Sequence, residues 1–112
     1  MISQHQQLAD GRWKTLSFFE QMANIGSEVE RTISWKNKGN QDYSRQAFYR
    51  AIELLDLSIE TYAKSTKGKE LVRIREAMAD HFAFSNSYHS TDASWQRYFH
   101  AFTWAARAGK QD

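Results

Sequence analysis

Two charged residues, Arg75 and Asp56, stand among apolar residues at spacings typical of a helix. Arg75 comes four residues after Leu71, and Asp56 comes four residues after Ile52. Because residues three or four apart share one face of a helix, each charge lies on or beside an apolar face. An arginine in that position either pairs with a carboxylate or binds a ligand at an active site. We predict the first, a structural ion pair between Arg75 and Asp56.

The motifs of common metal and nucleotide sites are missing from the sequence. It has no cysteine, which excludes disulfides and thiolate metal sites. No glutamate precedes a histidine by three residues and no two histidines are four residues apart, so the ligand patterns of di-iron and helical zinc sites are missing. Glycine-rich phosphate-binding motifs are missing too. We therefore predict no catalytic residue, no metal site and no cofactor.

Other polar residues near apolar faces have ordinary structural interpretations. His81 shares a side of its helix with Ile74, Ala77 and Met78. A lone histidine there is predicted to pack in the core rather than to bind a ligand. A polar stripe on the first helix is interpreted as a solvated face; it consists of Glu20, Asn24, Ser27, Glu28 and Arg31.

Arg75 and His81 are separated by five residues. In an all-helical chain this spacing resembles the motif of the HEPN-domain ribonucleases. The resemblance implies that Arg75 and His81 would act without metal at an RNA phosphodiester, often across a dimer. The alternative to the prediction of no catalytic residue is therefore that Arg75 and His81 are catalytic.

The stretch from Leu16 to Arg107 resembles small uncharacterised bacterial helical-bundle proteins of the orphan or mobile gene cassette type. The sequence segments that carry this resemblance are residues 20–29, 51–57 and 90–92. It implies a bacterial origin and an all-helical fold, and it implies no activity.

Composition and periodicity predict an all-α, up-down-up-down four-helix bundle. The chain has 112 residues, no proline and 41% hydrophobic residues, enough for one helical domain. Ser17 and Glu20 predict a capping box at the start of the first helix, which ends at Gly39. Further helices are predicted at about 44–63 and 70–84, and from an N-cap at residue 90 or 91 to Gly109. Residues 1–14 are predicted to form a loose N-terminal arm, and residues 15–112 the bundle domain.

Basic residues concentrate in particular segments although the net charge is only +2. Residues 31–50 and 64–75 each carry five basic residues and one acidic residue. In an up-down bundle the second segment and both chain ends share one end, near Trp13 and Trp104. Their basic residues are a candidate nucleic-acid patch, with a solvated rim as the alternative: Arg12, Lys14, Lys64, Lys67, Lys69, Arg107 and Lys110.

The fourth helix carries more aromatic surface than a single core needs. Tyr98, His100 and Trp104 are left over from its main apolar stripe, and we predict that they form an interface. Self-association as a symmetric dimer is the expected way to cover them. The alternative is that Trp104 covers the N-terminal arm around Trp13 within one chain.

The sequence has no apolar run long enough to cross a membrane and no apolar stretch near its N-terminus, so we expect a cytoplasmic protein without a membrane partner. The expected function is a non-catalytic, self-associating helical interaction module. The alternative is a nucleic-acid-binding bundle, of which a HEPN-like ribonuclease would be the enzymatic form.

Overall fold

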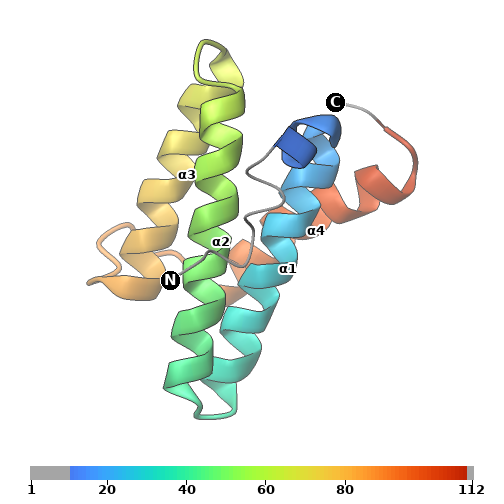
Figure 1. The fold of residues 1–112 in the computed structure, drawn as a ribbon. Helices are drawn as coiled ribbons and strands as arrows, with labels where there is room; N and C mark the ends of the chain where they lie inside the picture. The colour runs from blue at the N-terminus through green and yellow to red at the C-terminus, as the bar shows by residue number, and fades with distance from the viewer. Residues whose placement is uncertain (1–10, 111–112) are drawn as a thin grey trace.

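The computed structural model describes residues 11–110, and these form the predicted all-α four-helix bundle (Figure 1). A short 3-10 turn, η2 (Trp13–Thr15), precedes the helices. The helices are α1 (Phe18–Asn37), α2 (Gln41–Thr61), α3 (Thr66–Ala83) and α4 (Asp92–Arg107). No helix in this part of the chain combines the length and the apolar character needed to cross a bilayer.

Local capping determines where the helices begin. Ser17 and Glu20 form the predicted capping box, in which the serine side chain accepts from the Glu20 N–H and the carboxylate accepts from the Ser17 N–H. α2 and α3 begin three to four residues earlier than predicted, because Asn40 and Ser65 act as their N-caps. The N-cap of α4 is Thr91, one of the two residues, 90 and 91, that were predicted for this position.

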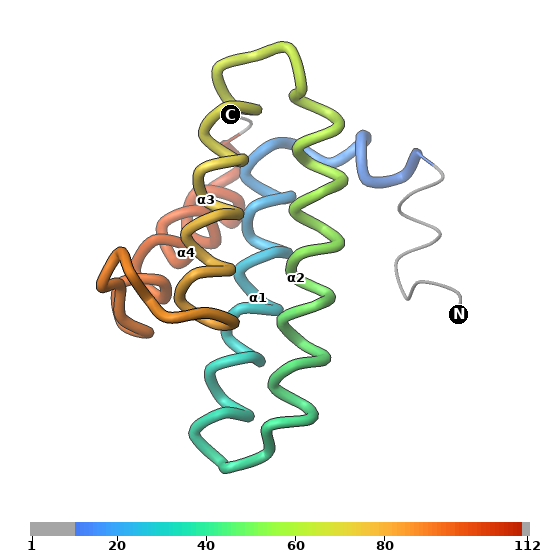
Figure 2. Tube along the Cα trace, turned by 90° about the vertical axis from the view of Figure 1, so that its left-hand side faces the viewer, coloured from blue at the N-terminus to red at the C-terminus, as the bar shows by residue number. Residues whose placement is uncertain are grey.

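The helices are arranged around a central antiparallel pair, α1 and α2. α3 runs antiparallel to α2 along its outer side, and α4 lies obliquely across α1 (Figures 1 and 2). A β-carbon at Gly26 of α1 would lie 2.7 Å from the β-carbon of Phe99 of α4. Only glycine therefore allows α1 and α4 to cross so closely.

All four helices contribute apolar side chains to a single core. Buried members of this core include Met22, Ile25 and Val29 of α1, Ala51 and Leu55 of α2, Leu71 and Met78 of α3, and Trp95 and Phe99 of α4. At the end of the bundle where α1 begins, the ring of Phe18 makes edge-on contacts with Tyr62 and Phe102, at centroid distances of 5.3 and 5.9 Å.

Trp13 is not part of a loose arm. Its side chain is 1% exposed, and its indole Nε1 donates to Oγ of Ser58 on α2 at 2.9 Å. The prediction for residues 11–14 is therefore wrong at Trp13. The reason is that the large indole ring packs in the apolar core while its polar N–H binds a hydrogen-bond acceptor on α2. Residues 1–10 of the predicted arm lie outside the described residues.

Candidate functional site

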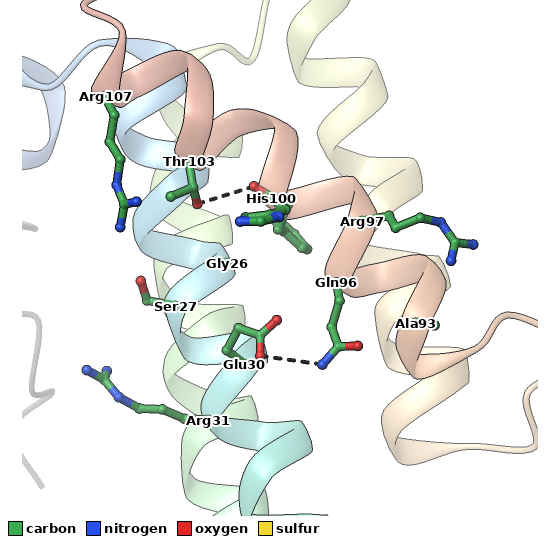
Figure 3. Close-up of a pocket in the computed structure, with 11 residues that line it drawn as sticks. Gly26, Ser27, Glu30, Arg31, Ala93, Gln96, Arg97, His100, Thr103 and Arg107 are labelled. Carbon is green, nitrogen blue, oxygen red and sulfur yellow. Dashed lines mark hydrogen bonds between the residues drawn. The ribbon is translucent and has the colours of Figure 1, made fainter.

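A groove of about 620 Å³ lies between α1 and α4 (Figure 3). It exists because α4 crosses α1 obliquely, at the close contact of Gly26 with Phe99. Eleven residues line the groove: Gly26, Ser27, Glu30 and Arg31 of α1, and Ala93, Gln96, Arg97, Phe99, His100, Thr103 and Arg107 of α4.

Three of the lining side chains are basic groups without a partner among the described residues. Arg97, His100 and Arg107 are exposed and make no hydrogen bond or ion pair with any residue in the range 11–110. Their spacings of three and seven residues place them along one face of α4. Figure 3 shows Arg107 at one end of this face, beside α1, and Arg97 toward the other end with its guanidinium extending away from α1, and His100 lies between them. The groove therefore offers free hydrogen-bond donors to an anionic ligand.

The middle of the groove carries uncharged polar groups and one carboxylate. Gln96 Nε2 donates to Glu30 Oε2 at 3.5 Å, and this contact bridges α4 and α1 (Figure 3). Thr103 Oγ1 donates to the backbone oxygen of Phe99 at 3.4 Å. These groups keep acceptor positions free for a ligand, so the groove combines cations at its ends with hydrogen-bonding groups in between.

The three residues predicted to form an interface do not share one environment. His100 and Trp104 are exposed, and Trp104 has 66% of its surface accessible. Tyr98 is half-buried, and its ring contacts Trp95, Phe99 and Phe102. Burial, with a smaller contribution from the charge of Glu70, raises the pKa of Tyr98 to about 12. Tyr98 thus belongs with the intrachain aromatic cluster, and His100 and Trp104 face outward.

Trp104 lies beside the basic residues of the groove. It follows His100 by four residues and precedes Arg107 by three, so all three share the outer side of α4. The Lys110 ammonium stands 5.7 Å from the centre of the Trp104 ring. Residues 93–110 contain Arg97, Arg107 and Lys110 as charged groups and no acidic residue, so α4 after Asp92 contributes only positive charge to this side.

The residues of the predicted basic patch come from three places: the segment before α1, the turn from α2 to α3, and the end of α4 with the residues that follow it. Six of its residues are exposed: Arg12, Lys14, Lys64, Lys69, Arg107 and Lys110. Lys67 is half-buried, with its ammonium 5.4 Å from the centre of the Phe18 ring. Trp13 cannot stack on a ligand there because it is buried. Arg107 belongs both to this predicted patch and to the residues that line the groove.

Arg75 and Asp56 come together as an ion pair. Nε of Arg75 donates to Oδ1 of Asp56 at 2.7 Å, and a terminal nitrogen donates to Oδ2 at 3.4 Å. This hydrogen bonding raises the pKa of the Arg75 guanidinium. The two side chains are 42% and 51% exposed, so the pair bridges α3 and α2 at the surface rather than inside the core.

His81 is a packed histidine, as predicted, and its partner is Asp92. The His81 side chain is 9% exposed, and its Nε2 lies 2.8 Å from Oδ1 of Asp92 at the start of α4. The ammonium of Lys36 lies 2.8 Å from the same oxygen. Burial alone would raise the pKa of Asp92, but the hydrogen bonds and charges of Lys36 and His81 outweigh it and lower that pKa. Nδ1 of His81 is buried without a hydrogen-bond partner among residues 11–110.

Arg75 and His81 are therefore held by different carboxylates, Asp56 on α2 and Asp92 on α4. The structure does not join them in one site. Sequence reasoning missed the role of Asp92 as a partner of His81, because the long connection from α3 to α4 decides which residues meet there.

Glu28 is a second residue that sequence reasoning placed wrongly. Its side chain is buried and binds two guanidinium groups, those of Arg31 on α1 and Arg50 on α2, the latter at 2.7 Å. The interpretation of the polar stripe as solvated is wrong at this residue. The reason is that Glu28 faces α2, where Arg50 compensates its charge.

Among residues 11–110, no three acidic or histidine side chains lie close enough together to hold a metal ion. No protein family, curated protein or solved structure matches this chain.

Proposed function

We propose that this chain is a non-catalytic helical binding module that holds an anionic partner in the groove between α1 and α4. The observation that carries the proposal is the row of basic groups Arg97, His100 and Arg107, which line the groove and have no partner in the part of the chain that the structure describes. Arginines elsewhere on the chain, such as Arg50 and Arg75, are paired with carboxylates. Unpaired cations in a concave site favour an anion as the ligand.

The arrangement of the remaining polar residues supports binding rather than catalysis. Metal-independent acid–base chemistry needs two groups that reach the same reacting atoms. Arg75 and His81 contact separate carboxylates on different helices, and within residues 11–110 no side chain orients the His100 ring by a hydrogen bond. A catalytic role for Arg75 and His81 would require both of these contacts to break.

Retention on an immobilised polyanion, heparin, tests the proposal. The Arg97→Gln, Arg107→Gln double variant is expected to elute at lower salt than the unmodified chain, because two groove cations are lost. The matched control is Arg45→Gln, Arg73→Gln, which removes the same charge from two exposed arginines outside the groove. Equal shifts for both double variants would contradict a role for the groove.

Self-association is the second candidate function, and the exposure of Trp104 favours it. A two-fold contact across α4 would bring the same surface of two copies together and oppose Arg97 and Arg107 with the basic residues of the other copy. A dimer of this kind is therefore expected to strengthen as salt rises, whereas anion binding weakens.

Light scattering at micromolar concentration and two salt concentrations separates the two behaviours. A species near twice 13.1 kDa, weakened by Trp104→Ala or His100→Glu, would support the dimer. A monomer at both salt concentrations would contradict it.

A further inference from the structure

We infer that the anionic partner of the groove is a single-stranded nucleic acid, one base of which stacks on Trp104. This inference rests on the proposed function and names the class of partner. Three features of the site support it: an exposed aromatic ring among cations, the mixed polarity of the groove, and the length of the basic face.

Trp104 has the surroundings of a stacking platform. Its indole is 66% exposed, Lys110 stands 5.7 Å from the ring centre, and His100 and Arg107 lie one turn away on either side. A base that covers the ring has its phosphates within reach of these basic groups. Proteins that bind single strands combine stacked aromatic rings with cations in this way, whereas a base inside a duplex has no free face to offer.

The middle of the groove distinguishes a nucleic acid from an acidic protein. Glu30 lines the groove, and its carboxylate repels acidic side chains and phosphates alike, so the phosphates of a nucleic acid have to lie at the basic residues away from it. The same carboxylate accepts hydrogen bonds from N–H groups of base edges, the N3–H of thymine included, and the neighbouring Gln96 amide can both donate and accept. In this arrangement the basic groups at the ends of the groove would contact phosphates, and the amide and the carboxylate between them would contact base edges.

The basic face has room for a short strand. Arg97 and Arg107 are ten residues apart on α4, which corresponds to about 15 Å along the helix axis. At a stacked rise of ~3.4 Å per nucleotide, this length accommodates about four nucleotides. Lys110, which is exposed and comes three residues after Arg107, adds a further basic group beyond this length.

The test is a titration of the full chain with a fluorescein-labelled 12-nucleotide oligothymidine, followed by anisotropy at several salt concentrations. Trp104→Ala is expected to weaken binding by about 5- to 150-fold, the value of one stacked base, and Trp104→Phe to restore most of it. Tyr88→Ala is the matched control, because Tyr88 is equally exposed but lies on the connection from α3 to α4. It is expected to bind like the unmodified chain.

Salt dependence reports on the phosphate contacts. The Arg97→Gln, Arg107→Gln double variant is expected to reduce the slope of log affinity against log salt by about 1.4, since each phosphate contact to a single strand contributes about 0.7. Arg45→Gln, Arg73→Gln is expected to leave the slope unchanged.

Competition experiments show which conclusion fails. If a 12-base-pair duplex or polyglutamate displaces the probe better than unlabelled oligothymidine does, the inference of a single strand is wrong. It is also wrong if Trp104→Ala binds as tightly as Tyr88→Ala, or if the chain binds heparin through the groove but does not bind the oligonucleotide. If the chain binds neither heparin nor the oligonucleotide, the proposed function fails as well.

Discussion

The indole Nε1 of Trp13 donates a hydrogen bond to Oγ of Ser58, a residue 45 positions later in the chain. Ser58 in turn donates to Oε1 of Gln21 at 2.7 Å, and Gln21 Nε2 donates back to the carbonyl oxygen of Trp13 at 3.1 Å. All three residues are at most 1% exposed. This closed ring of hydrogen bonds ties the segment before α1 to both central helices and leaves no member of the ring unsatisfied.

Ser58→Ala is expected to lower the free energy of unfolding by about 2–3 kcal/mol, because it leaves the Trp13 N–H and the Gln21 oxygen buried without partners. Urea denaturation measures the loss. Ser34→Ala is the control, since Ser34 is exposed on α1 and makes no side-chain hydrogen bond with residues 11–110; its effect is expected within ~0.5 kcal/mol. Similar values for the two variants would show that the ring does not stabilise the fold.

Glu28→Gln is expected to destabilise the protein by about 1–3 kcal/mol. The substitution removes the negative charge between Arg31 and Arg50, and the Arg50 side chain is mostly buried. Glu60→Gln, on the exposed side of α2, serves as the control in the same chemical denaturation experiment. A loss no larger than that of Glu60→Gln would mean that solvent, rather than Glu28, compensates the Arg50 charge.

The ion pair of Arg75 and Asp56 is expected to contribute less than about 1 kcal/mol, because both side chains are substantially exposed. A double-mutant cycle with Arg75→Ala and Asp56→Ala measures the coupling energy, which should fall as salt rises. A coupling of about 3–5 kcal/mol is typical of breaking a fully buried pair and would contradict the surface location.

Asp92 is expected to make stability depend on pH in the acid range. Its pKa in the folded protein is lower than in the unfolded chain, so the native state binds fewer protons and unfolding becomes less favourable as pH rises. The stabilisation is complete above the ordinary aspartate pKa of about 3.9 and is lost as pH falls through the lowered value.

Urea denaturation between pH 2 and 6 checks this dependence. Asp92→Asn is expected to be less stable than the unmodified chain at pH 6, and the difference should shrink toward pH 2. Asp42→Asn is a matched control, because Asp42 also lies in the first turn of a helix but is exposed. A difference for Asp92→Asn that stays constant with pH would contradict the lowered pKa.

The protein is expected not to cleave RNA. On an ideal helix, the six steps from Arg75 to His81 leave the two side chains about 120° apart, and each side chain is bound to a different carboxylate. Incubation of structured and single-stranded RNA with the chain in EDTA tests this expectation. Cleavage that disappears in both Arg75→Ala and His81→Ala would instead support the resemblance to HEPN ribonucleases.

Features that depend on neighbouring residues could be predicted from the sequence. The capping box of Ser17 and Glu20 is an example, because its two partners are three residues apart and act before any tertiary contact. The apolar periodicity that predicted four helices is local in the same sense. The predicted starts of α2 and α3 were a few residues too late. Their N-caps are Asn40 and Ser65, residue types that favour turns as well as helix starts, so the sequence alone does not show which of the two they form.

The sequence by itself thus determined an all-α chain with four helices, and it placed Arg75 and Asp56 on faces that could meet. Only the tertiary structure decided that Trp13 is buried, that Glu28 faces Arg50, and that Arg97, His100 and Arg107 line one groove. The physical reason is that helix formation depends on local spacing, whereas these contacts depend on how α4 crosses α1. That crossing is set by the approach of Gly26 to Phe99, residues 73 positions apart in the sequence, and no local pattern encodes it.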